Sequence, residues 1–160
     1  MPNLAGVFRI TLFALVSGVL ASCRTGGGTS VSAPLTPSAP AVAITQADLP
    51  GRWGLASYRD EADVVRTEAE AKRACSNPYK IDPGPNGGVM MHLADQSSPS
   101  ELFLKSDSQG RVFIGPTGPP AVQQDRMVVS FENGILIADW LDPNTRERYG
   151  TMVLARCGST

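Results

Sequence analysis

Residues 127–140 read MVVSFENGILIADW, and this stretch indicates the fold of the chain more clearly than any other. Its centre, Asn133-Gly134, favours a two-residue hairpin turn, because asparagine and glycine both adopt the positive φ angles that such a turn needs. Before the turn, Met127, Val129 and Phe131 alternate with other residues and are expected to share one face of a strand. After it, an apolar segment returns as a second strand. The sequence therefore predicts an antiparallel hairpin.

Short segments of the same kind lie on both sides of this hairpin, and residues typical of turns separate them. The turns are expected at 83–88 (PGPNGG), 107–110 (DSQG) and 142–145 (DPNT). The strands are expected at 53–58, 79–81, 89–93, 101–105, 112–114, 127–131, 135–141 and 148–157. Eight consecutive strands can close into a barrel, which leaves no sheet edge unpaired. We therefore predict an all-β fold, an eight-stranded antiparallel up-and-down barrel.

One segment of the domain departs from this pattern. Residues 60–74 (DEADVVRTEAEAKRA) contain no glycine or proline and are rich in alanine and glutamate, which favours a helix. Asp60 can cap its start, with Asp63 three positions on. Lys72 and Arg73 lie at its end, where cations suit the helix dipole. We predict one helix inserted between strands one and two, where it covers the barrel wall or one mouth.

The N-terminal residues have the organisation of a bacterial export signal. Arg9 precedes the apolar run 10–21, which is shorter than the roughly 20 residues that a membrane-spanning helix needs. The run ends in Leu20-Ala21-Ser22-Cys23, which resembles the lipobox of bacterial lipoproteins. The resemblance implies that residues 1–22 are a signal peptide, that the Cys23 thiol is diacylated, and that the chain is cut just before Cys23. The alternative is an ordinary cleaved signal with a chance cysteine.

The residues after the lipobox indicate a location and a tether. Arg24 stands where an aspartate, in the sorting of enteric lipoproteins, tends to retain the protein in the inner membrane. Its identity therefore favours the outer membrane, with the domain facing the periplasm or, alternatively, exposed at the cell surface. Residues 23–45 are rich in glycine, serine and proline, and we expect a disordered spacer or, alternatively, an arm that docks on a partner. The barrel domain is then expected at 46–157, and a short tail at 158–160.

Two cysteines remain once Cys23 is set aside, namely Cys75 and Cys157. An even number of cysteines in an oxidising compartment favours a disulfide, which here would join the end of the helix to the last strand. The alternatives are a metal-binding pair or a reactive thiol. The chain has one histidine and no CxxC motif, so a zinc site would lack ligands and we expect no metal.

The two ends of the barrel domain carry a second resemblance. Residues 48–53 (DLPGRW) resemble the G-x-W motif that begins lipocalin and calycin barrels, with Gly51 and Trp53 as the motif residues. Arg156 stands where those families place an arginine on the last strand. The resemblance implies that Trp53 closes one barrel end and that Arg156 packs across it. The small bacterial barrels of the alkaline-proteinase-inhibitor family begin in a similar way, which implies inhibition of secreted metalloproteases.

Composition and motifs argue against several functions. The chain has 14 Lys and Arg against 15 Asp and Glu, a net charge of −1 without a basic stripe, so we expect no nucleic-acid partner. His92 has no Ser-His-Asp or Gly-x-Ser-x-Gly signature around it, which favours a strand residue on the exposed or mouth-facing side over a catalytic base. Gly84, Gly87 and Gly88 precede no Gly-Lys-Ser/Thr and form no phosphate loop. We expect no catalytic residue, no cofactor and no enzyme activity.

Asp139 is the one unusual charge, because it lies within an apolar strand. If the even-numbered residues of 136–140 face the core, Asp139 faces solvent by alternation. If the odd-numbered residues face the core, Asp139 is a buried acid, and Arg148 or Arg156 on the neighbouring strand would pair with it.

Three functions from different classes fit these features. The first, which we expect, is a lipid-anchored envelope lipoprotein that presents the barrel to an envelope protein as an interaction or structural module. The second is a binder of a small apolar ligand in the barrel lumen. The sequence does not identify its binding residues, although methionines would suit such a lumen: Met90, Met91, Met127 and Met152. The third is a protease inhibitor whose tether or barrel rim occupies a protease cleft.

Overall fold

The computed structural model describes residues 42–158. The predicted signal peptide, Cys23, the tether up to residue 41 and the last two residues of the predicted tail lie outside this range. The segment Pro37–Thr160 forms one compact unit. Its described residues contain their own hydrophobic core and a closed sheet, which are the properties of an independently folding domain.

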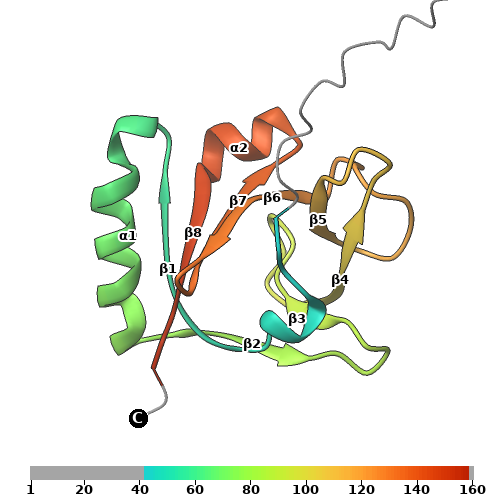
Figure 1. Cartoon of the computed structure of the whole chain (residues 1–160), viewed down its shortest axis with the longest axis horizontal. Helices are drawn as coiled ribbons and strands as arrows, with labels where there is room; N and C mark the ends of the chain where they lie inside the picture. Colours follow the sequence, from blue (N-terminus) through green and yellow to red (C-terminus); the bar gives the residue numbers. More distant parts are fainter. Residues whose placement is uncertain (1–41, 159–160) are drawn as a thin grey trace, which may run out of the picture. The chain divides into compact units, whose positions relative to one another are not determined.

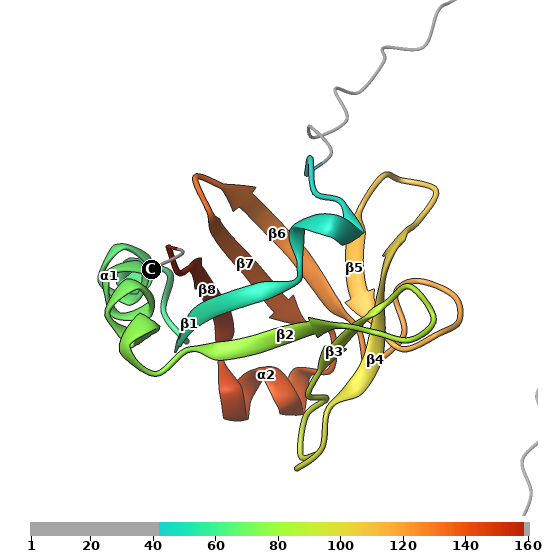
Figure 2. The same ribbon diagram turned by 90° about the horizontal axis from the view of Figure 1, so that it is seen from below.

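Eight antiparallel strands form a closed barrel, in which each strand pairs with its neighbours in the sequence and β8 pairs with β1 (Figure 1). The strands are β1 (Gly51–Tyr58), β2 (Tyr79–Pro83), β3 (Val89–Met91), β4 (Ser100–Ser106), β5 (Val112–Gly115), β6 (Arg126–Glu132), β7 (Ile135–Trp140) and β8 (Thr151–Arg156). The predicted up-and-down barrel is therefore confirmed. Figure 2 shows the strands from below, with a first helix beside β1 and a second helix next to β8.

The predicted helix between the first two strands is also confirmed. It consists of η2 (Glu61–Asp63), α1 (Val64–Arg73) and η3 (Ala74–Ser76). Asp60 caps it by accepting a hydrogen bond from the Ala62 backbone N–H at 2.9 Å. α1 packs on the outer side of β1 and β8, and Gly54 permits this close approach, because a Cβ there would lie 1.8 Å from the Ala71 carbonyl oxygen. The helix thus covers the barrel wall, one of its two expected positions.

Hydrophobic residues are buried on both sides of the sheet at β7 and β8. The interior cluster fills much of the barrel with Leu49, Trp53, Ile81, Val89, Met91, Leu93, Leu102, Val112, Ile114, Val128, Leu136 and Leu154. A second cluster lies between the barrel wall and α1 and comprises Tyr58, Ala71, Ile137, Val153 and Ala155. Leu136 therefore faces inward and Ile137 outward, yet both are buried. This double burial explains why the four residues from Ile135 to Ala138 are all apolar.

The hairpin turn forms as predicted, with φ angles of 51° at Asn133 and 75° at Gly134. The predicted face of the strand before it is wrong, because a β-bulge shifts the register between Val128 and Ser130. Val128 is buried, whereas Val129 is 46% exposed. The extra residue of a bulge reverses the alternation that follows it, so Phe131 again packs against the interior cluster.

A second helix, α2 (Pro143–Tyr149), stands where the sequence predicted a turn at 142–145 and the beginning of the last strand. The Asp142 side chain caps it by accepting from the Thr145 backbone N–H at 2.9 Å. A proline in the first turn favours this helix start, and Gly150, with a φ angle of 72°, ends the helix. The last strand consequently begins at Thr151.

Asp139 is buried on the outer side of β7, and neither of its predicted partners, Arg148 and Arg156, pairs with it. Arg146 of α2 does so, with Nη2 at 3.1 Å from Oδ2. The Thr151 hydroxyl adds a hydrogen bond at 3.2 Å. The even-numbered residues of β7 face the interior, as in the first alternative, but Asp139 on the outer face is buried and not exposed to solvent. Its partner Arg146 lies on a helix that was not predicted.

The predicted disulfide between Cys75 and Cys157 is confirmed, with an S–S distance of 2.08 Å. Cys75 belongs to η3 and Cys157 directly follows β8. The bond therefore joins the end of the helical insertion to the end of the barrel, as expected.

The folded domain includes residues before its predicted start at Gln46. Val42 and Ile44 pack against the interior cluster. Thr45 and Asp48 then form a capping box around η1 (Gln46–Asp48), with the Thr45 hydroxyl 2.7 Å from Asp48 Oδ2. The end of the predicted tether thus belongs to the folded domain, because its alternating apolar residues add to the core.

Candidate functional site

Trp53 lies at one end of the barrel, beneath Arg156. The indole is fully buried, and its Nε1 donates a hydrogen bond to the Leu49 carbonyl at 2.9 Å. The Arg156 guanidinium carbon lies 4.3 Å from the centroid of the Trp53 ring. A Cβ at Gly51 would lie 3.0 Å from Arg156 Nη1, so the glycine leaves room for the arginine. The structure brings together the three residues named by the lipocalin resemblance.

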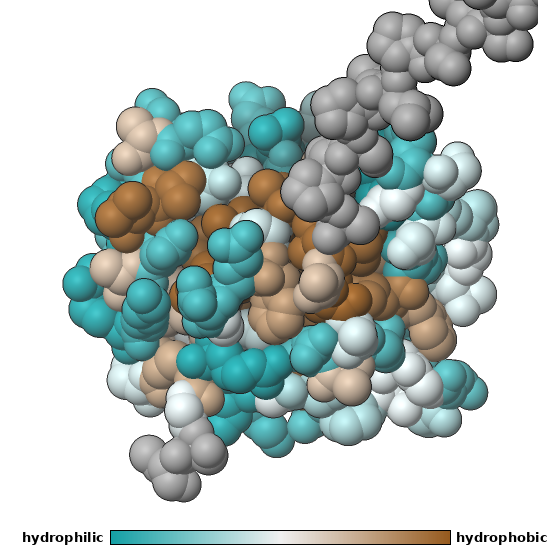
Figure 3. Space-filling view, in the orientation of Figure 1, coloured by the Kyte–Doolittle hydropathy of each residue, from teal (hydrophilic) through white to brown (hydrophobic). Residues whose placement is uncertain are grey.

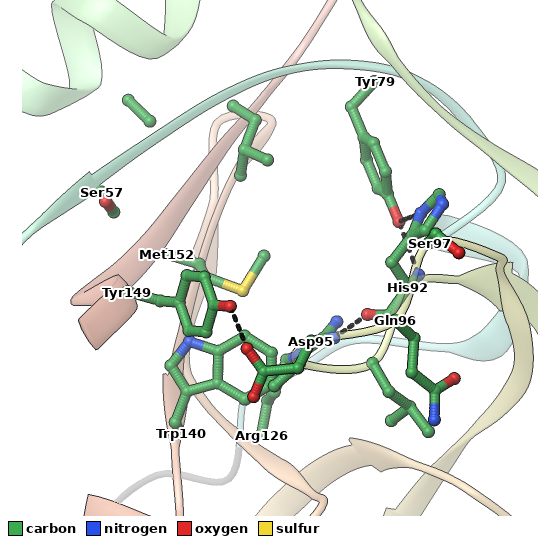
Figure 4. A pocket seen from close by; sticks show the side chains of 14 residues that line it. Ser57, Tyr79, His92, Asp95, Gln96, Ser97, Arg126, Trp140, Tyr149 and Met152 are labelled. Carbon is green, nitrogen blue, oxygen red and sulfur yellow. Dashed lines mark hydrogen bonds between the residues drawn. The ribbon is translucent and has the colours of Figure 1, made fainter. Parts of the chain in front are cut away.

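The other end of the barrel contains a cavity of about 640 Å³. It exists because β1 pairs with β2 only from Gly51 to Trp53, so the second half of β1 has no partner strand on that side. β1, β2, the β3–β4 loop, β6, β7, α2 and β8 all contribute lining residues, many of which are shown in Figure 4. The barrel is therefore filled at one end and hollow at the other.

Apolar side chains form much of the cavity wall. Leu55, Trp140 and Met152 line it together. Among the described residues, five large hydrophobic side chains are exposed, and two of them, Leu55 at 40% and Tyr149 at 41%, line this cavity. The space-filling view faces the η1 side of the domain and not the cavity, and it shows a separate group of hydrophobic residues in its middle with hydrophilic residues around them (Figure 3). Exposed apolar surface in a cavity is a common feature of ligand sites.

The methionines that were expected to line a lumen divide into two groups. Met152 lines the cavity, and Met91 is buried in the interior cluster. Met90 and Met127 each have buried residues on both sides in their strand and are themselves only half-buried. Strand alternation therefore turns Met90 and Met127 away from the interior.

Arg126 lies at the inner end of the cavity. It is 2% exposed, the least exposed of the lining residues. Its Nη2 donates to the His92 carbonyl, and its guanidinium carbon lies 4.2 Å from the centroid of the Trp140 ring. Its Nε and Nη1 are buried without a hydrogen-bond partner. Burial lowers the pKa of Arg126 to about 10, so the guanidinium is still charged at neutral pH.

No carboxylate lies within ion-pair distance of Arg126 in the part of the chain that the structure describes. The aromatic stack on Trp140 compensates only part of the lost hydration of a buried cation. Trp140 Nε1 is also buried without an acceptor. The inner end of the cavity is therefore positively charged and rich in unused hydrogen-bond donors.

Tyr79 and His92 form the wall next to Arg126. The Tyr79 hydroxyl accepts a hydrogen bond from the His92 backbone N–H at 2.9 Å and lies 3.3 Å from His92 Nδ1. The two ring centroids are 5.8 Å apart. His92 thus faces the barrel mouth, one of the two positions that the sequence predicted for it.

Asp95 ties the β3–β4 loop to α2 at the rim of the cavity. Its carboxylate accepts from Arg148 Nη1 at 3.0 Å and from Arg148 Nη2 at 2.6 Å. It also accepts from the Tyr149 hydroxyl, as Figure 4 shows. The hydrogen bonds from Tyr149 and Arg148 hold the pKa of Asp95 below its usual value. Asp95 is therefore ionised at neutral pH and forms an ion pair with Arg148 at the rim.

Sequence reasoning missed Arg126, Tyr79 and Tyr149 as site residues. The available signal was that Arg126 shares the inward alternation of Val128, but the bulge in β6 hides this pattern from the sequence. Within residues 42–158, no group of three or more His, Cys, Asp or Glu side chains is placed to hold a metal ion. No helix in this range is long and apolar enough to cross a membrane.

No family model, curated protein or solved structure matches this chain. Its function is therefore inferred from the cavity itself and from the sequence features described above.

Proposed function

We propose that this protein is a lipid-anchored envelope protein whose barrel binds a small amphipathic molecule in the cavity at its hollow end. The cavity carries the proposal. Its volume of about 640 Å³ falls in the range typical of small-molecule sites, and its lining combines apolar walls with a few converging polar groups. This is the binding function expected as an alternative from the sequence, now joined to the envelope location that was expected first.

The lining distinguishes the cavity from a packing defect. An empty packing defect is apolar and closed, because buried polar groups require partners. Here the cavity is open to solvent, because its lining residue Leu55 is 40% exposed, and the buried nitrogen atoms of Arg126 and Trp140 lack acceptors. A bound molecule would cover the Leu55 side chain and accept hydrogen bonds from these nitrogen atoms.

The location is supported by sequence and by the disulfide. Leu20-Ala21-Ser22-Cys23 resembles a lipobox, and a diacylated Cys23 would anchor the barrel in the outer membrane with the domain facing the periplasm. The Cys75–Cys157 bond suits an oxidising compartment. In this proposal the barrel binds and does not catalyse, and a partner protein in the envelope would exchange the bound molecule.

A neutral dye tests the proposed cavity. N-phenyl-1-naphthylamine, which fluoresces in apolar surroundings, is titrated into the unit Pro37–Thr160, and we expect saturable binding. Leu55→Trp, which places an indole in the cavity, is expected to weaken binding at least about tenfold. Val129→Trp is the matched control, because Val129 is a similarly exposed strand residue that is not part of the cavity lining.

Saturable binding that Leu55→Trp removes and Val129→Trp retains supports the proposal. Absence of binding, or equal loss in both variants, overturns it and leaves the interaction module as the expected function. Metalloprotease inhibition, implied by the second resemblance, stays a prediction. A protease assay with the full chain checks that prediction separately.

A further inference from the structure

We infer that the ligand is an amphipathic monocarboxylate, with its carboxylate on Arg126 at the inner end of the cavity and its apolar body against Leu55, Trp140 and Met152. The inference rests on the proposed function and adds the chemical class of the ligand. Its basis is the buried cation that no described residue neutralises.

A buried guanidinium without an anion lowers the stability of the fold, because the charge has lost its hydration and few hydrogen bonds or ion pairs replace it. Arg126 donates one hydrogen bond, from Nη2 to a backbone carbonyl, and keeps two buried nitrogen atoms without acceptors. Arginine offers its donors in a planar arrangement that matches the two oxygens of a carboxylate. An anion at the inner end of the cavity would therefore replace the lost hydration of the guanidinium and accept hydrogen bonds from its free nitrogen atoms.

The opposite end of the barrel provides an internal comparison. Arg156 also stacks on a tryptophan, at 4.3 Å against 4.2 Å for Arg126. However, Arg156 is exposed to solvent, and it donates to the backbone carbonyls of Asp48 and Pro50. An arginine that only covers a tryptophan therefore has hydrogen-bond acceptors and contact with solvent in this fold. Arg126 differs from Arg156 because it is buried and two of its nitrogen atoms have no acceptor. Of the two arginines, only Arg126 lines the cavity.

The charges around the cavity limit the ligand to one negative charge. Arg126 is the only lysine or arginine that lines the cavity within the described residues. Asp95 at the rim contributes a carboxylate, whose paired cation, Arg148, does not line the cavity. Because Arg148 already pairs with Asp95, a dianion would find only one unpaired cation in the lining, whereas a monocarboxylate is matched by Arg126 at the inner end.

The rest of the lining requires an apolar body. Leu55 and Met152 lie on neighbouring paired strands, and they line the cavity together with Trp140, whose ring stacks on the guanidinium. A ligand whose head reaches Arg126 passes these side chains on its way to the mouth. A small inorganic anion would leave this apolar surface uncovered and is a poorer occupant.

Displacement of the bound dye distinguishes the contribution of the ligand's head group to affinity from that of its apolar body. The dye complex of Pro37–Thr160 is titrated with decanoate, decan-1-ol and decyltrimethylammonium, which share a chain and differ in charge. We expect decanoate to displace the dye at a concentration at least about tenfold lower than the alcohol, and the cation to be the weakest competitor. Arg126→Met should bring decanoate to the level of decan-1-ol, with each competitor measured against that variant's own affinity for the dye. Arg126→Lys should keep part of the preference.

The controls keep the test decisive. Arg156→Met removes the arginine at the filled end and should leave the decanoate preference unchanged. Melting temperatures and near-ultraviolet circular dichroism show whether each variant is folded. Equal displacement by decanoate and decan-1-ol in the wild-type domain overturns the inference while the proposed function stands. If the dye itself does not bind, the proposed function fails first.

Discussion

Lys105 and Asp125 form the most deeply buried ion pair among the described residues, with side chains 9% and 0% exposed. Lys105 Nζ lies 2.7 Å from Asp125 Oδ1 and also donates to the carbonyls of Pro116 and Pro119, each at 3.0 Å. Three acceptors therefore surround one ammonium group. The pair holds the β5–β6 loop against β4, and it gives a loop rich in proline and glycine a fixed position.

Lys105→Met is expected to lower the free energy of unfolding by about 3–5 kcal/mol, because it leaves the Asp125 carboxylate buried without a cation. Urea denaturation followed by circular dichroism measures the change. Lys80→Met is the control, since Lys80 and Asp82 are about two-thirds exposed and 3.6 Å apart, and its effect should stay within about 1 kcal/mol. Adding Asp125→Asn to Lys105→Met should recover part of the loss. A double variant no more stable than the single one contradicts the stranded-charge explanation.

Residues whose role depends on local sequence were predicted well. Asn133-Gly134 specifies its turn through its own φ angles, and Asp60 caps a helix that begins directly after it. Arg126 was not predictable in this way, because its proposed role depends on its burial without a neutralising carboxylate. A single strand pattern shows neither the burial of a guanidinium nor the lack of a carboxylate in three dimensions.

At the scale of elements, the largest error was α2. The signals were present, because Asp142 and Pro143 are typical of a helix start and Gly150 of a helix end. They also describe a turn, and a helix as short as α2 has too little periodicity to decide between the two. The packing of α2 against β7 and its contacts with Asp95 and Asp139 stabilise the helix. These are tertiary contacts that the local sequence does not contain.

The disulfide is the element-scale feature with the clearest effect on stability. Cys75 and Cys157 are 82 residues apart, so the bond removes much of the freedom of the unfolded chain. The loop-entropy relation gives about 4.5 kcal/mol as an upper value for this contribution. Cys157→Ser should therefore lower the melting temperature markedly and free one thiol at Cys75. Two reactive thiols in the oxidised wild-type protein would contradict the bond.

At the scale of the whole chain, a nearly neutral composition conceals two regions with very different charge content. The net charge of −1 averages a sparsely charged N-terminal region with a barrel domain that contains most of the charged residues. Within the domain, charge is arranged locally, with an unpaired cation at the inner end of the cavity and a carboxylate at its rim. Membrane attachment by charge is not expected from this composition, so the proposed anchor is the acyl group on Cys23.

Cys23→Ser tests that anchor in the intact protein. The substitution removes the thiol that the lipobox resemblance marks for acylation, and we expect incorporation of a labelled fatty acid to cease and the protein to leave the membrane fraction. Cys157→Ser is the matched control, because it also replaces a cysteine by serine but leaves the lipobox intact, so the acyl label and the membrane location should persist. A Cys23→Ser protein that still incorporates the label rules out Cys23 as the acylation site. Loss of the label with retention in the membrane would instead show that another segment of the chain attaches it.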